Sequence, residues 1–294
     1  METSELLKKV RKIEIKTKGL SKQVFSGEYH SAFKGRGMAF SEVRNYIPGD
    51  EIRTIDWNVT ARFNEPYVKV FEEERELTVM LIVDISGSES FGSSEVLKRE
   101  FIAEIGAVLA FSATQNNDKI GAILFSDKIE LYIPPKKGRK HILRIIRELI
   151  EFKPKSNLTN ISEVVQHFNN LIKKRAIAFL ISDFLESNLE NALKITAKKH
   201  DLIALRVFDE REKELPNTGM TLFSDSETGQ KKWINTSKKR VRETYYNNSL
   251  SREHNILESF KKSKVDHANI CIQDGYIHPL MNLFKKRGEN FFSY

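Results

Sequence analysis

Residues 77–84 read LTVMLIVD, an almost continuous run of apolar side chains that ends in the carboxylate of Asp84. Strands buried on both faces have this composition, because helices cover both sides of a parallel α/β sheet. The pattern recurs in AIAFLISD, residues 176–183, which ends in Asp183. We therefore predict that these two runs form the centre of a mostly parallel sheet, with one aspartate at the carboxyl end of each strand.

Strand and helix patterns alternate on both sides of these runs. Further strands are predicted at residues 119–126, 128–135, 201–208 and 265–272, a hairpin at 220–235, and helices at 95–114, 141–150, 161–172, 189–199, 237–262 and 276–287. Alternation of this kind is typical of βαβ crossovers, which build a parallel sheet with helices on both faces. The sequence thus predicts a doubly wound, Rossmann-type α/β domain over residues 76–290.

Residues 1–75 lack this regular alternation. A helix is predicted over residues 5–16, and a glycine- and charge-rich stretch follows, with a turn at the PGD of residues 48–50. Because few apolar residues are contiguous here, we expect an irregular N-terminal extension that packs on the main domain.

Charged residues of both signs surround a tryptophan in this extension: Arg44, Asp50, Arg53, Asp56, Trp57 and Arg62. One interpretation is a network of ion pairs and hydrogen bonds that fixes an irregular segment, whose backbone groups need partners. The other is a docking surface for a protein partner.

Composition narrows the class of protein. Apolar residues make up 40% of the 294, enough for a sizeable core, and no stretch reaches the roughly 18 to 20 apolar residues of a membrane span. The N-terminus lacks the apolar centre of a signal peptide, and one cysteine, Cys271, excludes an internal disulfide. We expect a cytoplasmic protein. The net charge is +8, but acidic residues are interspersed with the basic ones along the chain. A dedicated nucleic-acid binder usually concentrates its basic residues, so this distribution argues against one.

Oxygen-bearing side chains follow the predicted strands at the sheet edge where open α/β proteins bind ligands. They are Asp84, Ser86 and Ser88 in the DISGS loop, Thr159 in a second loop, and Asp183 in a third. Hard oxygen donors without nitrogen or sulfur suit Mg²⁺ or, with looser geometry, Mn²⁺ or Ca²⁺. Such an ion could take its last ligand from an Asp or Glu of a partner. The simpler alternative is that Ser-Gly-Ser forms only a turn and helix cap.

The DISGS loop resembles the DxSxS motif of von Willebrand factor A-like domains, which forms their metal-ion-dependent adhesion site. The resemblance implies that Asp84, Ser86 and Ser88 are ligands, that Thr159 matches the threonine of the second loop, and that Asp183 matches the aspartate of the third. It also implies a von Willebrand factor A-like fold.

A longer stretch narrows the resemblance. Residues 35–62, GRGMAFSEVRNYIPGDEIRTIDWNVTAR, followed by VKVFEEE at 68–74, resemble the signature of the bacterial DUF 58 family, whose members carry a von Willebrand factor A-like domain. Members are often encoded beside a MoxR-type AAA+ ATPase. The resemblance therefore implies an adaptor or chaperone-like role with such an ATPase or its client.

Enzyme motifs are missing from the same regions. Ser86 lies where haloacid-dehalogenase-like phosphatases need a second carboxylate, and the chain has neither a G-x-S-x-G elbow nor a GxxxxGK[ST] loop. We interpret the chain as a protein-binding module and not as an enzyme. The alternative is a Mg²⁺- or Mn²⁺-dependent phosphoesterase or nuclease acting on an anionic substrate.

Overall fold

A six-stranded sheet forms the centre of the protein in the computed structural model, which describes residues 3–21, 29, 33, 38–73, 76–87, 97–186, 188–225 and 228–291. Its strand order is β10-β7-β6-β3-β4-β5. The strands are β3 (Thr78–Asp84), β4 (Lys119–Phe125), β5 (Ile129–Lys136), β6 (Ile177–Ser182), β7 (Asp201–Phe208) and β10 (Asp266–Cys271). All neighbours are parallel except β5, which pairs antiparallel with β4 at one edge. The predicted α/β class with a mostly parallel sheet is confirmed.

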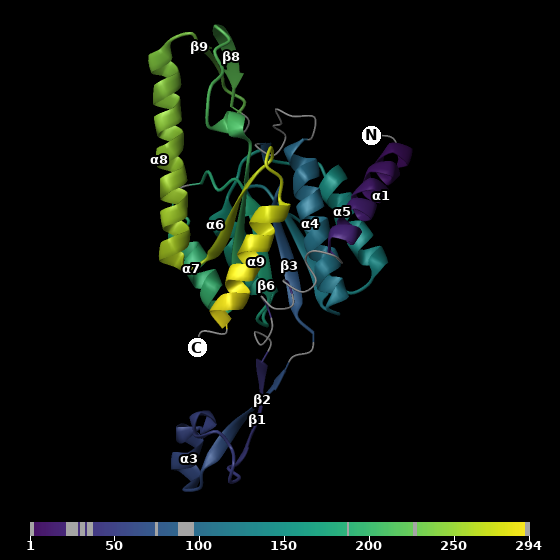
Figure 1. The fold of residues 1–294 in the computed structure, drawn as a ribbon, viewed down its shortest axis with the longest axis vertical. Helices are drawn as coiled ribbons and strands as arrows, with labels where there is room; N and C mark the ends of the chain where they lie inside the picture. Colours follow the sequence, from purple (N-terminus) through teal and green to yellow (C-terminus); the bar gives the residue numbers. More distant parts are fainter. Residues whose placement is uncertain are drawn as a thin grey trace.

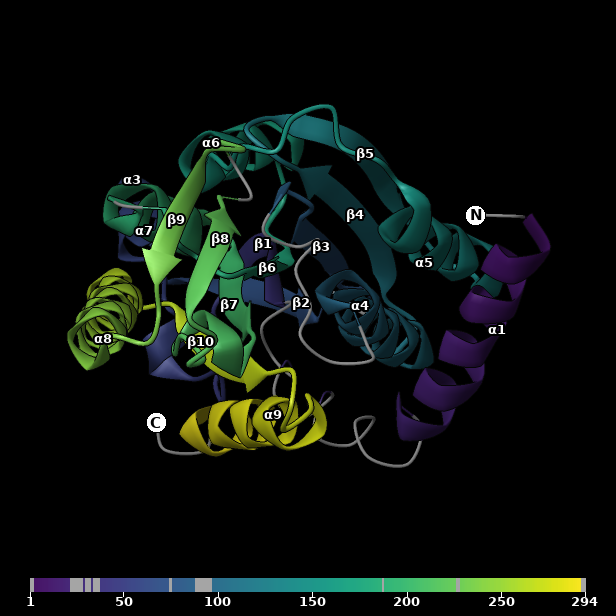
Figure 2. The ribbon, with the colours of Figure 1, turned by 90° about the horizontal axis from the view of Figure 1, so that it is seen from above.

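Helices cover both faces of the sheet (Figure 2). One layer contains α1 (Thr3–Leu20), α4 (Lys98–Gln115), α5 (Arg139–Glu151) and α9 (Ile277–Phe291), and the other contains α6 (Ile161–Leu171), α7 (Glu190–Lys199) and α8 (Lys239–Ser263). Successive side chains of a strand point to opposite faces, so Leu81 packs in the first layer and Ile82 in the second. This double burial explains why β3 is apolar along nearly its whole length.

The N-terminal part divides into two units with different positions. Helix α1 packs against α4 and α5 through Val10 and Ile13, and the buried rings of Tyr29 and Phe33 join the same core. The next unit contains β1 (Met38–Asn45), the 3-10 helix η2 (Ile52–Thr54), α3 (Trp57–Phe63) and β2 (Tyr67–Glu73).

We call residues 38–73 the hairpin unit, because β1 and β2 pair antiparallel within it. It extends away from the sheet and its helices (Figure 1). The expectations of an irregular segment, and of one packed throughout on the main domain, are therefore wrong for these residues. The two strands satisfy each other's backbone groups, so the unit does not need the main domain for its hydrogen bonds.

A second hairpin lies at the opposite end of the molecule. The strands β8 (Met220–Ser224) and β9 (Lys231–Asn235) form the predicted antiparallel pair, next to the start of α8 (Figure 1). Strand β3 begins just after the hairpin unit, so its carboxyl end and the loops there lie at the far end of the sheet from that unit. Within the described ranges, no helix has the length and apolarity that crossing a membrane requires.

Candidate functional site

The carboxyl ends of β3 and β6 place two predicted ligand loops side by side. These strands are parallel neighbours with Val83 opposite Ile181, so Asp84 and Ser182 emerge at the same level. The Ser182 hydroxyl donates to Asp84 Oδ2 at 2.7 Å, and the Ser86 backbone N–H donates to Oδ1 at 2.9 Å. The buried carboxylate of Asp84 is thus fixed by both loops.

The second predicted loop is hydrogen-bonded to the first. The Gly87 N–H donates to the carbonyl oxygen of Asn157 at 3.0 Å, and the Asn160 N–H donates to that of Ser126, just after β4, at 3.2 Å. The Asn160 side chain then accepts from the N–H of Glu163 at 2.9 Å and caps α6. The half-buried Thr159 lies between these two anchored asparagines, on the loop that meets the DISGS loop.

The structure therefore brings Asp84, Ser86 and Asp183 to one edge of the sheet and anchors the loop of Thr159 beside them. Ser88 lies outside the described residues. Among those that are described, no three His, Cys, Asp or Glu side chains gather in a way that could hold a metal ion. The predicted donor set is different in kind, since it combines two carboxylates with hydroxyl groups.

Burial and a neighbouring charge change the acidity of Asp84. Burial, and after it the negative charge of Asp183, raise its pKa to about 7, against the hydrogen bonds from Ser182 and Ser86. Two close carboxylates repel each other, and a divalent cation between them would offset that repulsion. In this respect the residues fit a hard cation.

A buried lysine occupies the other side of Asp183. Lys98, the first residue of α4, is fully buried, and its Nζ lies 3.3 Å from Asp183 Oδ2 and 3.3 Å from Glu212 Oε1. Burial raises the pKa of the Glu212 carboxyl. A buried ammonium needs such partners, because desolvation of an unpaired charge is costly. Asp183 therefore already interacts with one internal cation.

Sequence reasoning missed Lys98, Glu212 and Ser182. Lys98 and Glu212 are charged residues in charged surroundings, and nothing in their spacing indicates that they are buried. Ser182 could have been found, because it is the polar residue that ends an apolar strand beside Asp84 in the sheet.

The residues of the predicted docking surface all lie in the hairpin unit. Arg44 and Asp50 form a two-bond ion pair at 2.7 and 2.8 Å, and Asp56 caps α3 by accepting from the N–H of Asn58 at 3.0 Å. Their contacts match the interpretation as an internal network.

The other three predicted docking residues face solvent. Arg53 and Arg62 are exposed, and Trp57 has 66% of its surface accessible. Three large apolar side chains of the same unit are exposed as well: Ile47, Ile52 and Phe63. Several large apolar side chains on one small exposed unit are typical of an interaction surface.

Two uncharacterized bacterial proteins are similar to this chain in sequence. The chain is 30% identical to the uncharacterized protein Rv1480 of Mycobacterium tuberculosis over 223 residues, which cover 75% of this chain and 70% of that one. It is 27% identical over 109 residues to the uncharacterized protein YeaD of Bacillus subtilis, which covers 37% of this chain and 25% of that protein.

A solved structure shares the fold. It is that of an aerotolerance-related membrane protein from Bacteroides fragilis, with a TM-score of 0.50 at 15% sequence identity, covering 73% of this chain and 99% of that one. The family described as "Protein of unknown function DUF58" matches residues 42–255, from the hairpin unit into α8. This match spans most of the chain, and the protein belongs to the DUF58 family.

Proposed function

We propose that this protein is a metal-dependent protein-binding module whose loops after β3 and β6 hold a divalent cation. The site corresponds to the metal-ion-dependent adhesion site of a von Willebrand factor A-like domain, and the ion is Mg²⁺ or, with looser geometry, Mn²⁺ or Ca²⁺. The observation that supports it is the gathering of Asp84, Ser86 and Asp183 at one edge of the sheet, with the Thr159 loop hydrogen-bonded beside them.

In this proposal the hydroxyl groups of Ser86, Ser88 and Thr159 bind the ion directly. Asp84 and Asp183 bind it or orient its water molecules, and the pairing of Asp183 with Lys98 favours the second role for Asp183. Two carboxylates leave room for another anionic ligand, and a partner's Asp or Glu would supply it.

The proposed partner is a MoxR-type AAA+ ATPase or its client, with this protein as an adaptor. This choice rests on the family resemblance alone, since DUF58 members are often encoded beside such an ATPase. The geometry adds that two surfaces are available, since the loops after β3 and β6 and the hairpin unit lie at opposite ends of the molecule (Figure 1). An adaptor needs two such surfaces to hold two proteins at once.

Calorimetric titration with Mg²⁺ and Mn²⁺ tests the ion site. Asp84→Asn keeps the size of the side chain but removes the charge, and we expect it to abolish measurable binding. Asp274→Asn is the matched control, because Asp274 is an exposed aspartate just after β10, at the same edge of the sheet. Equal affinity of wild type and Asp84→Asn would remove the metal site from the proposal.

The buried carboxylate with a pKa of about 7 also favours a second candidate, because catalytic acids and bases are tuned in this way. A phosphoesterase would hydrolyse p-nitrophenyl phosphate or its diester with Mn²⁺ and would lose that activity in Asp84→Asn. We expect no turnover by either protein.

A further inference from the structure

Two cavities adjoin along α8 next to the candidate ion site. The smaller has a volume of about 180 Å³, and Asp183 contributes to its wall. The larger, of about 770 Å³, lies between α8 and the chain that follows β6. Leu185 and Arg252 line both cavities, so together they form one groove that begins at Asp183.

Two cations of the smaller cavity share a single carboxylate. Arg206 in β7 is only 6% exposed, and its Nη1 donates to Glu253 Oε1 at 2.9 Å. Lys213 Nζ lies 3.0 Å from the other oxygen of Glu253. The Nε of Arg206 is buried and has no hydrogen-bond partner in the part of the chain that the structure describes. A guanidinium in this state has unused donor capacity in a water-poor place.

The other charged residues of the smaller cavity do not neutralise Arg206 and Lys213. Asp183 and Glu212, the carboxylates of the wall, both lie beside Lys98. The exposed Arg252 donates a long bond of 3.4 Å to the carbonyl of Asn248 in its own helix and, within the described ranges, makes no ion pair. An anionic group entering the cavity would meet three cationic side chains, Arg206, Lys213 and Arg252, and charge-assisted hydrogen bonds to such groups are strong.

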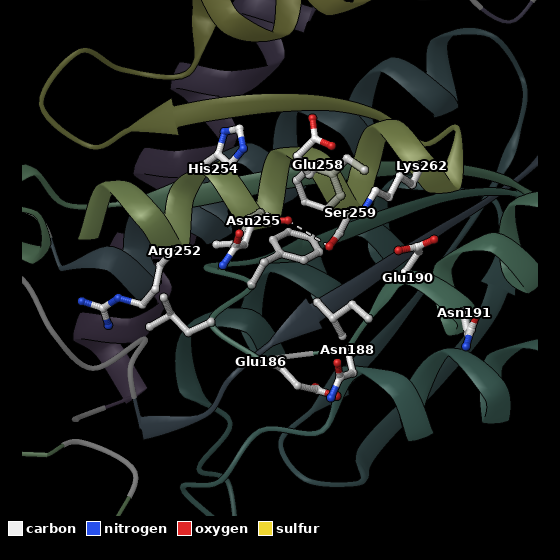
Figure 3. A pocket seen from close by; sticks show the side chains of 15 residues that line it. Glu186, Asn188, Glu190, Asn191, Arg252, His254, Asn255, Glu258, Ser259 and Lys262 are labelled. Atoms are coloured by element: carbon white, nitrogen blue, oxygen red, sulfur yellow. Dashed lines mark hydrogen bonds between the residues drawn. The ribbon is translucent and has the colours of Figure 1, made fainter. Parts of the chain in front are cut away.

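The sizes of the cavities indicate what kind of anion fits. A cavity of about 180 Å³ is smaller than the roughly 300 to 1,000 Å³ of sites that enclose a whole small molecule, so it suits a single side chain. The larger cavity has room for neighbouring residues. Polar side chains of α8, among them His254, Glu258 and Lys262, line one wall, and Glu186, Asn188 and Glu190 line the other (Figure 3). The three glutamates outnumber the cations of this cavity, so it suits an uncharged stretch of chain.

We propose that this groove binds an extended, otherwise uncharged segment of the partner protein that carries one acidic side chain, whose carboxylate enters the smaller cavity and is held by Arg206, Lys213 and Arg252. The inference rests on the proposed function, because Asp183 belongs to both sites and the partner that ligates the ion would also occupy the groove. It names a second anchor that is independent of the metal.

Fluorescence anisotropy with a fluorescein-labelled peptide that carries one glutamate among glycines and alanines tests the groove, and the same peptide with glutamine in place of the glutamate is the neutral control. We expect the wild-type protein to bind the glutamate peptide and Arg252→Glu to weaken that binding about tenfold or more, because the substitution replaces an attraction by a repulsion. Lys213→Gln should weaken it in the same direction. Arg240→Glu is the matched control, since it makes the same charge change at an exposed position of α8 outside both cavities.

Equal affinities of Arg252→Glu and Arg240→Glu would overturn the proposal, as would equal binding of the two peptides. Tighter binding of a single-stranded oligonucleotide than of the glutamate peptide would overturn it too. Repeating the titration in EDTA separates the two proposals. If EDTA leaves the effect of Arg252→Glu unchanged, peptide binding in the groove does not depend on a metal ion. The calorimetry of Asp84→Asn tests the metal site separately.

Discussion

The hydroxyl of Ser182 donates a 2.7 Å hydrogen bond to the buried carboxylate of Asp84, so that the end of β6 holds the first residue of the DISGS loop. This bond joins residues 98 positions apart in the chain. Because it stabilises the charged form of Asp84, it lowers a pKa that burial raises. Ser182 therefore acts as a positioning residue for the proposed ion site without being one of its ligands.

Replacement of Ser182 by alanine should affect both the fold and the ion. A buried acceptor that loses its donor costs about 1 to 3 kcal/mol of unfolding free energy, and the poorly oriented carboxylate should bind Mg²⁺ several-fold more weakly. Urea unfolding and calorimetry measure the two effects. Ser112→Ala is the control. Ser112 lies in α4, away from the site, is equally buried, and its hydroxyl forms a 3.0 Å hydrogen bond with that of Ser21. Loss of Mg²⁺ affinity in both variants would mean that general destabilisation, and not positioning, is the cause.

The stability of the metal-free protein should fall as the pH rises from about 4 to about 7. The folded-state pKa of Asp84 is about 7, whereas an aspartate in the unfolded chain has its ordinary pKa of 3.8, so in this window the folded protein binds the extra proton and deprotonation favours unfolding. Affinity for Mg²⁺ should rise over the same window, because the ion needs the ionised carboxylate.

Urea unfolding in EDTA across this window, for wild type and Asp84→Asn, measures the effect. The asparagine variant should lose this component of the pH dependence, since it has no proton to release. An unchanged pH profile in the variant would show that another group is responsible.

Removal of the buried ammonium should destabilise the protein strongly. Lys98→Met leaves the carboxylates of Asp183 and Glu212 without their shared cation, which typically costs about 3 to 5 kcal/mol. If an ion binds beside Asp183, added Mg²⁺ should restore part of the thermal stability of this variant. Lys119→Met is the control, because the Lys119 side chain is 46% exposed and pairs with Glu76 at the surface, a bond worth about 0 to 1 kcal/mol. A Lys98→Met melting temperature that does not respond to Mg²⁺ would contradict the ion site.

The hairpin unit offers a separate test of partner binding. Trp57 is 66% exposed, so Trp57→Ala should change the unfolding free energy by no more than about 0.5 kcal/mol. If the unit docks the ATPase, the variant should nevertheless fail to retain a MoxR-type AAA+ ATPase in a pull-down. Trp233→Ala in β9 is the matched control, with the other tryptophan of the chain exposed to 64% at the opposite end of the molecule. Equal retention by both variants would leave the hairpin unit with a structural role.

The central sheet and its helices could be predicted because burial on both faces leaves a strong local pattern. The apolar runs 77–84 and 176–183 correspond to β3 and β6, and the helix predicted at 141–150 spans Arg139–Glu151. The alternation of strands and helices also predicts that these two strands are parallel. Their carboxyl ends, with Asp84 and Asp183, are therefore expected at the same edge of the sheet. For these elements the pattern of neighbouring residues was sufficient.

The hairpin unit and the surroundings of the site were not predictable in this way. Strands β1 and β2 alternate apolar and charged residues too weakly to indicate a sheet, and their pairing depends on a partner strand more than 20 residues away. Lys98 meets Asp183 across 85 positions of the chain, and Arg206 meets Glu253 across 47. The sequence by itself determined which segments are buried, because the spacing of apolar residues along a strand or helix indicates which of its faces lie in the core. Only the tertiary structure decided which charges face one another, because a charged side chain carries no local sign of the partner that will neutralise it.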